Sequence, residues 1–364
     1  MQQKIHQLDA VRGLAILLVI AHNTSAKYPS LHLQRFFGNG WMGVDLFFVL
    51  SGFLITGILA DTKDSVGYFT RFYARRCLRI WPLYYSLIFF MFVVVPWLRP
   101  SDAHTVFERS SPWWAYPLFL QNFLVPSSTG ATGPLGVTWS LAIEEQFYLV
   151  WPWVVRYCSH AQVRCIALAV ICLSPALRLY MSLHQVELYS NVFCRLDGLM
   201  AGALLALAVR SASFLPSKFV TLAWIAFALA APLACVTEAL NARWLVFSLT
   251  AVASTSFVYL SLFSTQKWLQ VAMTNKPIVY TGTISYGLYL LHKIPFDLAQ
   301  AFHLDQYLLL ALPLGLVASY AVAVLSWHLL EMPFLRLKRF VESTPRNANG
   351  RFVLAEKVAR SALS

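Results

Sequence analysis

Long apolar runs recur along the chain from Ile5 to Leu330, and only short polar connections separate them. A helix that crosses the hydrocarbon core of a bilayer needs about 20 mostly apolar residues. The runs approach this length and predict about ten transmembrane helices. Their expected ranges are Leu8–Ser25, Trp41–Ala60, Ile80–Leu98, Trp139–Val155, Val163–Met181, Val192–Val209, Phe219–Glu238, Trp244–Phe263, Ile278–Lys293 and Tyr307–Leu330.

One further apolar stretch, Trp113–Val125, is shorter and contains Pro117, Gln121 and Asn122. Its length and polar residues predict a re-entrant or interfacial segment rather than a crossing. The expected fold is therefore all-α, a polytopic transmembrane helical bundle with about ten crossings, forming one domain over residues 1–335. The basic, polar residues 336–364 are expected to form a tail on the membrane surface or a disordered tail.

The placement of Lys and Arg gives these helices an orientation, because short cytoplasmic loops are richer in both residues than external loops. If the N-terminus is cytoplasmic and the short stretch does not cross, the cytoplasmic face receives Arg71, Arg75, Arg76, Arg79, Arg156, Arg164, Arg210, Lys218, Lys267 and Lys276. The opposite face keeps Lys27, Arg35, Arg99, Arg109 and Lys293. Both termini are therefore predicted to be cytoplasmic.

Composition agrees with a membrane protein. Hydrophobic residues make up 58% of the chain and charged residues 12%, against about 25% charged residues in a soluble domain. The formal net charge of +12 could indicate nucleic-acid binding. The basic residues lie at the ends of apolar runs and in the tail, however, so we expect the lipid bilayer as a partner and no nucleic acid.

Ionisable residues inside membrane helices are costly, so each needs a partner or a function. The predicted helices contain Arg12, His22, Asp45, Glu144, Glu145, Arg195, Asp197, His292 and Glu331. Structural ion pairs are one explanation for any single member of this set. The predicted topology favours another, because it places most of them at a similar depth, Asp45 about 6 Å below Trp41 and Glu144 about 8 Å below Trp139. We expect one polar pocket in the outer half of the membrane.

A histidine beside a carboxylate is the usual general base for a hydroxyl nucleophile. This predicts a catalytic role for His22, with Asp45 or Glu144 as its partner; the sequence does not decide between the two. The remaining polar residues of the predicted pocket are expected to contact substrate: Arg12, Glu145, Arg195, Asp197, Tyr289 and His292. No HExxH or similar spacing is present, so we expect no metal.

A cluster of arginines, Arg75, Arg76 and Arg79, precedes the third predicted helix. Such a cluster can simply anchor the helix on its cytoplasmic side. It can also bind phosphate, because guanidinium groups pair with phosphate oxygens and the spacing of Arg76 and Arg79 puts both on one helical face. Acyl-CoA is a cytoplasmic phosphate-bearing thioester, so we expect it as the donor substrate; no permanently bound cofactor is expected.

Seven segments together resemble the acyltransferase-3 family of bacterial membrane O-acetyltransferases. They are LDAVRGLAILLVIAHN (8–23), GVDLFFVLSGFLIT (43–56), RRCLRIWPLYY (75–85), TWSLAIEEQFYLVWP (138–152), FCRLDGLMAGALLA (193–206), ISYGLYLLH (284–292) and SWHLLEMPFLRLKR (326–339). The resemblance implies a multi-pass protein of the bacterial cytoplasmic (inner) membrane. It also implies transfer of an acyl group, acetyl above all, from acyl-CoA to sugars of lipopolysaccharide, exopolysaccharide, peptidoglycan or smaller glycosides.

The family's essential residues are the histidine of the first helix and an Arg-x-x-Arg pair, which correspond here to His22 and to Arg76 with Arg79. The chain departs from the family pattern at one point. Ten residues usually separate the first-helix arginine from the histidine, whereas nine separate Arg12 from His22, and Asn23 occupies the expected place. One residue corresponds to about 100° of helical rotation. The role stays with His22, because an asparagine side chain cannot act as a base.

The expected function is therefore membrane-bound O-acyl transfer from cytoplasmic acyl-CoA to a carbohydrate or glycolipid acceptor. The alternative is a transporter or flippase for a glycan or lipid intermediate, since charged helices also line transport cavities. The chain shows no internal repeat, and transport alone does not require the arginine cluster. Acyl-CoA-dependent labelling of a glycan by purified protein separates the two functions.

Overall fold

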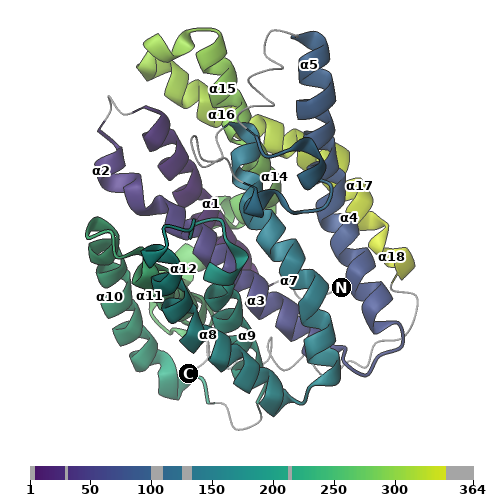
Figure 1. Ribbon diagram of the computed structural model, residues 1–364, viewed down its shortest axis with the longest axis vertical. Helices are drawn as coiled ribbons and strands as arrows, with labels where there is room; N and C mark the ends of the chain where they lie inside the picture. The colour runs from purple at the N-terminus through teal and green to yellow at the C-terminus, as the bar shows by residue number, and fades with distance from the viewer. Residues whose placement is uncertain (1–4, 29–31, 100–109, 125–132, 212–214, 342–364) are drawn as a thin grey trace.

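The computed structural model describes residues 5–28, 32–99, 110–124, 133–211 and 215–341. All regular structure in these ranges is helical, which confirms the predicted all-α class. Figure 1 shows the helices gathered side by side into one bundle. The tail predicted from residue 336 begins with the short helices α17 (Met332–Arg336) and α18 (Lys338–Val341), and residues 342–364 lie outside the described ranges.

The long helices follow the predicted order. They are α1 (His6–Lys27), α3 (Gly43–Asp61), α4 (Tyr68–Phe89), which continues through a π turn (Phe90–Val94) into α5 (Val95–Leu98), α7 (Thr138–Tyr157), α8 (His160–Leu183), α9 (Leu196–Arg210), α10 (Ser217–Ala239), α11 (Arg243–Phe263) and α16 (Leu308–Ser326). Shorter helices are α2 (Gln34–Phe37), α12 (Lys267–Thr274), α13 (Lys276–Thr283), α14 (Ser285–Leu291) and α15 (Lys293–Ala301).

Six helical segments in the described ranges are long and apolar enough to cross a membrane: Gln34–Asp61, Tyr68–Leu98, His160–Leu183, Ser217–Ala239, Arg243–Phe263 and Leu310–Phe340. The count of about ten crossings is not confirmed and stays a prediction. The other predicted crossings, α1, α7, α9 and α13 with α14, are shorter or more polar. These are also the helices that carry most of the candidate site residues.

The structure differs clearly from two predicted spans. Helix α4 begins at Tyr68 rather than Ile80, because the basic stretch before Ile80 packs its buried Phe72 inward and continues the helix. The predicted span Ile278–Lys293 is divided among α13, α14 and the first residue of α15. The stretch Trp113–Val125 contains only short 3₁₀ turns in its described part, where Gln121 and Asn122 are buried. That it does not cross the membrane stays a prediction.

Close packing between helices depends on glycine at two contacts. A Cβ atom on Gly202 of α9 would lie 2.0 Å from the carbonyl oxygen of Val49 in α3. A Cβ atom on Gly282 of α13 would lie 1.7 Å from the carbonyl oxygen of Asp9 in α1. Any larger residue would push these backbones apart, and small residues are the usual means of close helix approach in membranes. The two contacts set the positions of α1, α3, α9 and α13 around the site.

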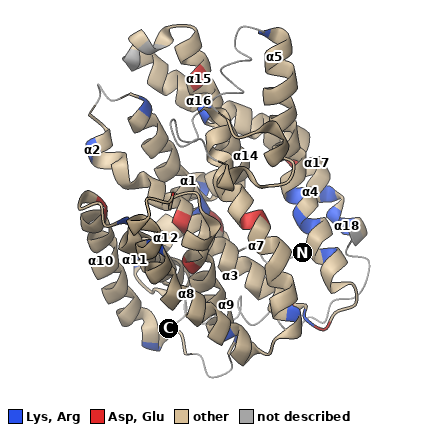
Figure 2. Ribbon diagram, viewed as in Figure 1, with Lys and Arg blue, Asp and Glu red and all other residues tan. Residues whose placement is uncertain are grey.

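Figure 2 shows that Lys and Arg gather on α4 and on α18, two helices that pack against each other. Both belong to the face that the sequence assigns to the cytoplasm. The sequence assigns the connection between α1 and α3, which carries α2, to the opposite face, and the start of α10 to the cytoplasmic face.

This arrangement predicts a labelling pattern in intact cells. In a background without the six native cysteines, a cysteine at exposed Gln34 should react with a membrane-impermeant maleimide, and one at exposed Ser217 should react only after permeabilisation. Mass shift of the protein measures the reaction. Equal labelling of both positions in intact cells, or the reverse pattern, contradicts the predicted topology.

Candidate active site

Two adjoining cavities lie among the helices. The arginine cavity has a volume of about 250 Å³, and its polar lining comes from Arg12, Ser51, Arg76, Arg79, Ser140, Glu144, Tyr148, Ser285, Tyr286 and Tyr289. The histidine cavity has a volume of about 200 Å³ and is lined by Val19, His22, Asn23, Trp41, Val44, Gly136, Val137, Trp139, Tyr189, Tyr289 and Lys293. Val44 and Tyr289 line both cavities, so the two meet at these side chains.

The arginine cavity carries an excess of positive charge. Arg12 from α1 and Arg76 and Arg79 from α4 line it together, and Arg12 is hydrogen-bonded to Asp9 at 3.0 Å. The buried Nε of Arg76 has no hydrogen-bond partner among the described residues. A buried donor without a partner costs free energy, which an anionic ligand would recover. Arg75, which we expected to share the donor site, does not line the cavity.

Glu144 is the acidic residue of the arginine cavity, not of a pocket around His22. Ser51 donates a hydrogen bond to its Oε1 at 2.7 Å, and Tyr148 donates one to its Oε2 at 2.9 Å. Its neighbour Glu145 lies outside both linings and accepts a long hydrogen bond from Trp81 Nε1 at 3.5 Å. Successive residues of a helix point about 100° apart, which explains why two adjacent acids have different surroundings.

His22 lines the second cavity, where its Nδ1 is buried and has no hydrogen-bond partner in the described part of the chain. Neither of the predicted carboxylate partners contacts it. Asp45 accepts hydrogen bonds from Arg195, with an Nη2–Oδ2 distance of 3.0 Å, and Glu144 is engaged by Ser51 and Tyr148. The expected histidine–carboxylate pair is therefore absent among the described residues, and Asp45 is paired with Arg195 instead.

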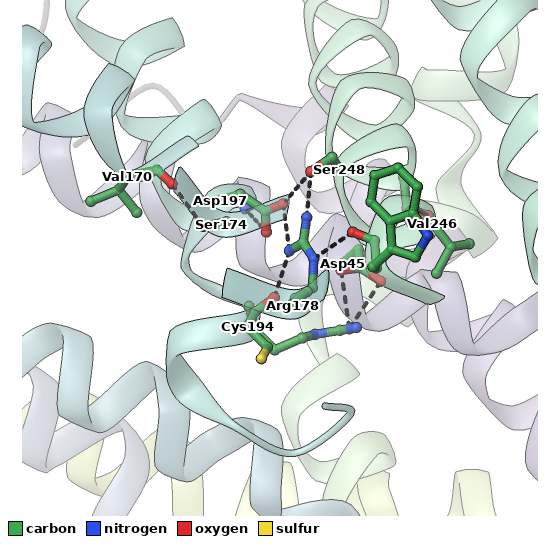
Figure 3. A network of polar contacts seen from close by, with 12 residues as sticks. Asp45, Val170, Ser174, Arg178, Cys194, Asp197, Val246 and Ser248 are labelled. Atoms are coloured by element: carbon green, nitrogen blue, oxygen red, sulfur yellow. Dashed lines mark hydrogen bonds and ion pairs between the residues drawn. The ribbon is translucent and has the colours of Figure 1, made fainter. Parts of the chain in front are cut away.

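Asp197 belongs to a buried network of polar contacts (Figure 3), and Arg195 directly follows Cys194, whose carbonyl oxygen is part of that network. Arg178 of α8 donates to Asp197 at 2.8 Å and to the carbonyl of Cys194 at 2.7 Å, and Ser248 of α11 also donates to Asp197. Neither Arg195 nor Asp197 lines either of the two cavities, and their contact with substrate stays a prediction.

Aromatic rings surround the Arg195 guanidinium, and its carbon lies 4.0 Å from the centre of Phe247. It also faces Trp41, Trp139 and Tyr189 at 5.8, 5.5 and 5.3 Å, and these three rings line the histidine cavity. The guanidinium thus holds the wall of the cavity through cation–π contacts.

His292 is fully buried and lies behind Asn23. Its Nε2 is 3.0 Å from Asn23 Nδ2, and its Nδ1 is 3.0 Å from the Leu288 carbonyl oxygen. The arrangement fits a neutral ring in which Nδ1–H donates to the carbonyl and Nε2 accepts from the asparagine amide. His292 therefore orients Asn23, which lines the cavity, and does not line it itself. Asn23 occupies the position where the family pattern expects the catalytic histidine.

Sequence reasoning missed two charged residues. Arg178 is 0% exposed and lies inside the predicted span Val163–Met181, where an arginine in an apolar run was a usable signal. Lys293 was counted among external basic residues, yet it lines the histidine cavity. The position of Lys293 directly after His292, a predicted pocket residue, was the signal in the sequence that it could lie near the site. Tyr289, which we expected to contact substrate, lines both cavities. Its hydroxyl group donates a hydrogen bond to the Val137 carbonyl oxygen at 3.0 Å.

Tyr189 stands in the connection between α8 and α9 and contributes a hydroxyl group to the histidine cavity. Burial raises the pKa of Tyr189 to about 12, so the phenol stays protonated near neutral pH. The described residues contain no group of three or more His, Cys, Asp or Glu side chains suited to a metal ion.

The chain matches the sequence profile of a family described as "Acyltransferase domain" over residues 5–328. It is 27% identical to "Peptidoglycan O-acetyltransferase OatA" of Listeria monocytogenes over 361 residues, which cover 90% of this chain and 55% of that protein. It is 28% identical to "Putative peptidoglycan O-acetyltransferase YrhL" of Bacillus subtilis over 353 residues, 90% of this chain and 54% of that protein. The chain thus spans about half the length of these two curated relatives. No solved structure matches it.

The buried network predicts a specific stability pattern. Asp45→Asn leaves the Arg195 charge buried with a neutral partner, and loss of one member of a buried ion pair costs about 3–5 kcal/mol. The variant should unfold at a clearly lower temperature in detergent, measured by size-exclusion chromatography after heating. Asp45→Asn combined with Arg195→Met removes the charge and should recover part of the loss. A single variant as stable as the parent would contradict the structural role of Asp45.

Proposed function

The chain belongs to the acyltransferase family that its residues 5–328 match, and on this basis we propose that it transfers an acetyl group from cytoplasmic acetyl-CoA to a hydroxyl of a surface or exported glycan. The observation that carries the proposal is the meeting of the two cavities at Val44 and Tyr289. One side of this junction is rich in arginine and suits a phosphate-bearing donor. The other side holds a histidine and aromatic rings and suits a sugar hydroxyl.

The donor binds in the arginine cavity. Arg76 and Arg79 hold its phosphate groups, and Arg12 adds a third positive charge to the same lining. The unpartnered Nε–H of Arg76 supports this assignment, because it can donate a hydrogen bond to a phosphate oxygen. The thioester end of the donor points to the junction, where the second cavity begins.

The acceptor binds in the histidine cavity with its hydroxyl group beside His22. The neutral ring takes the proton of this hydroxyl while the oxygen bonds to the thioester carbonyl carbon. The carbon–sulfur bond then breaks, and CoA leaves as the thiol with the proton that His22 returns. The unpartnered Nδ1 of His22 supports this role, because it leaves a ring nitrogen available to accept a proton.

The acceptor is a glycan on the far side of the membrane, and the protein resides in the bacterial cytoplasmic membrane with both termini cytoplasmic. The charge distribution supports this orientation. The names of the relatives make peptidoglycan the first acceptor to test. A transporter or flippase, by contrast, would move a glycan without forming a new ester bond.

Replacement of Arg76 or Arg79 by Ala should weaken acetyl-CoA binding by about tenfold or more, because a hydrogen bond to a charged group contributes about 1.5–3 kcal/mol. Isothermal titration of the purified protein measures the dissociation constant. Arg75→Ala is the matched control, since Arg75 has the same charge on the same helix and does not line the cavity. Equal acetyl-CoA affinity of the parent and all three variants would show that the arginine cluster does not bind the donor and only anchors the helix at the membrane.

His22→Ala should reduce acetyl transfer by about 10²- to 10⁴-fold, the usual contribution of a general base, and should leave acetyl-CoA affinity unchanged. His22→Asn should be equally inactive. Transfer is measured with radiolabelled acetyl-CoA and isolated peptidoglycan at saturating donor, and exposed His184→Ala serves as the control. Turnover of His22→Ala within about threefold of the parent would remove His22 from the mechanism.

A further inference from the structure

The histidine cavity contains a positive charge that the proposed transfer does not use. Its lining, as far as the structure describes it, includes one Lys, Lys293 at the start of α15, and no Asp or Glu. Lys293 is partly buried, and it has no salt bridge or hydrogen bond to any described residue. The cavity that receives the acceptor is therefore positively charged.

The acids near this cavity are engaged elsewhere. Asp297, one helical turn after Lys293, is paired with Lys27 of α1. Asp45 behind the wall is paired with Arg195. The charge of Glu238 also reaches His22, but Glu238 lies 3.8 Å from Arg243. Asp297 attracts Lys293 as well as Lys27, so two lysines share one carboxylate and one positive charge stays uncompensated. The other two carboxylates have their own cations.

An ammonium group held partly out of water without a partner has an energetic cost. A methionine would fill a similar volume at this position without that cost. The cost is recovered if a ligand brings a negative charge into the cavity, because a charge-assisted hydrogen bond forms on binding. The unpaired ammonium thus indicates an anionic ligand.

The other lining residues suit a sugar. Trp41, Trp139 and Tyr189 present aromatic rings that the Arg195 guanidinium holds in place from behind. Pockets of this kind combine flat apolar surfaces with a few polar groups that fix orientation. Asn23 and the Tyr189 hydroxyl add neutral hydrogen-bonding groups to the same cavity.

We propose that the histidine cavity selects a sugar that carries an anionic group, a carboxylate or a phosphate, and that Lys293 binds this group. The inference rests on the proposed function, because it defines the class of acceptor used at the same site. Lys293 then sets the orientation in which the acceptor hydroxyl meets His22.

Binding of three sugar probes to the full-length protein in lipid nanodiscs tests the proposal, by saturation-transfer NMR titration without acetyl-CoA. The probes are methyl glucuronoside, glucose 1-phosphate and the neutral methyl glucoside. At least one anionic sugar should bind about tenfold or more tightly than the neutral one, and the comparison of the two anionic sugars identifies the preferred group. Lys293→Gln should raise the dissociation constant of the preferred sugar to the neutral value, and Lys293→Arg should keep it within about threefold of the parent.

Equal affinity of the parent for all three probes, or no measurable binding of any, would overturn the proposal without reference to a variant. Unchanged affinities in a folded Lys293→Gln protein would also overturn it, and would fit a lysine that acts on the thioester oxyanion. Because the titration contains no donor, its outcome is separate from the acetyl-transfer assay. A protein that prefers anionic sugars and transfers no acetyl group would refute the proposed function and leave the anion-binding cavity in place.

Discussion

The polar interior depends on the cost of keeping a guanidinium group away from water. Arg178 and Arg195 are among the largest fully buried side chains, and each is paired with a carboxylate, Asp197 and Asp45. The pairs connect α3, α8 and α9, and Ser248 extends the network to α11. A buried ion pair stabilises little against apolar residues of the same size, but its geometry is strict, because each unpaired charge is costly. The network therefore fixes the positions of these helices relative to one another.

The same network also holds the aromatic side chains that line the histidine cavity. Rings that line this cavity also contact the Arg195 guanidinium, so the histidine cavity and the buried network share one set of aromatic side chains. Glycine contacts between α3 and α9 and between α1 and α13 bring the same helices close together. The site combines the shorter or more polar helices α1, α7 and α14 with α3 and α4, and the longer apolar helices α8, α10 and α16 supply much of the exposed apolar surface.

The first helix shows how a single residue changes the site. Arg12 reaches the arginine cavity and His22 the histidine cavity, so α1 contributes to both. Asn23 stands where the family pattern has its histidine, and its amide is bonded to His292. Asn23, which can neither give up nor accept a proton near neutral pH, is thus held at that position. The basic ring nitrogen belongs to the preceding residue, His22. In our proposal the buried His292 keeps Asn23 oriented, and His22 performs the proton transfer.

The sequence by itself determined the all-helical class, the order of the long helices and the family, because apolar runs of bilayer length and seven ordered motifs are properties of the chain. It also identified the residues of the two cavities that matter most for our proposal, His22, Arg76 and Arg79. Only the tertiary structure decided the partners of the charged groups. Depth along a helix follows from residue number, but the direction of a side chain and the neighbour it meets depend on how helices rotate and pack. Asp45 and Glu144 have nearly the depth expected for partners of His22, yet Asp45 faces Arg195, which precedes α9. Glu144 faces Ser51 of α3 and Tyr148, one turn further along its own helix α7.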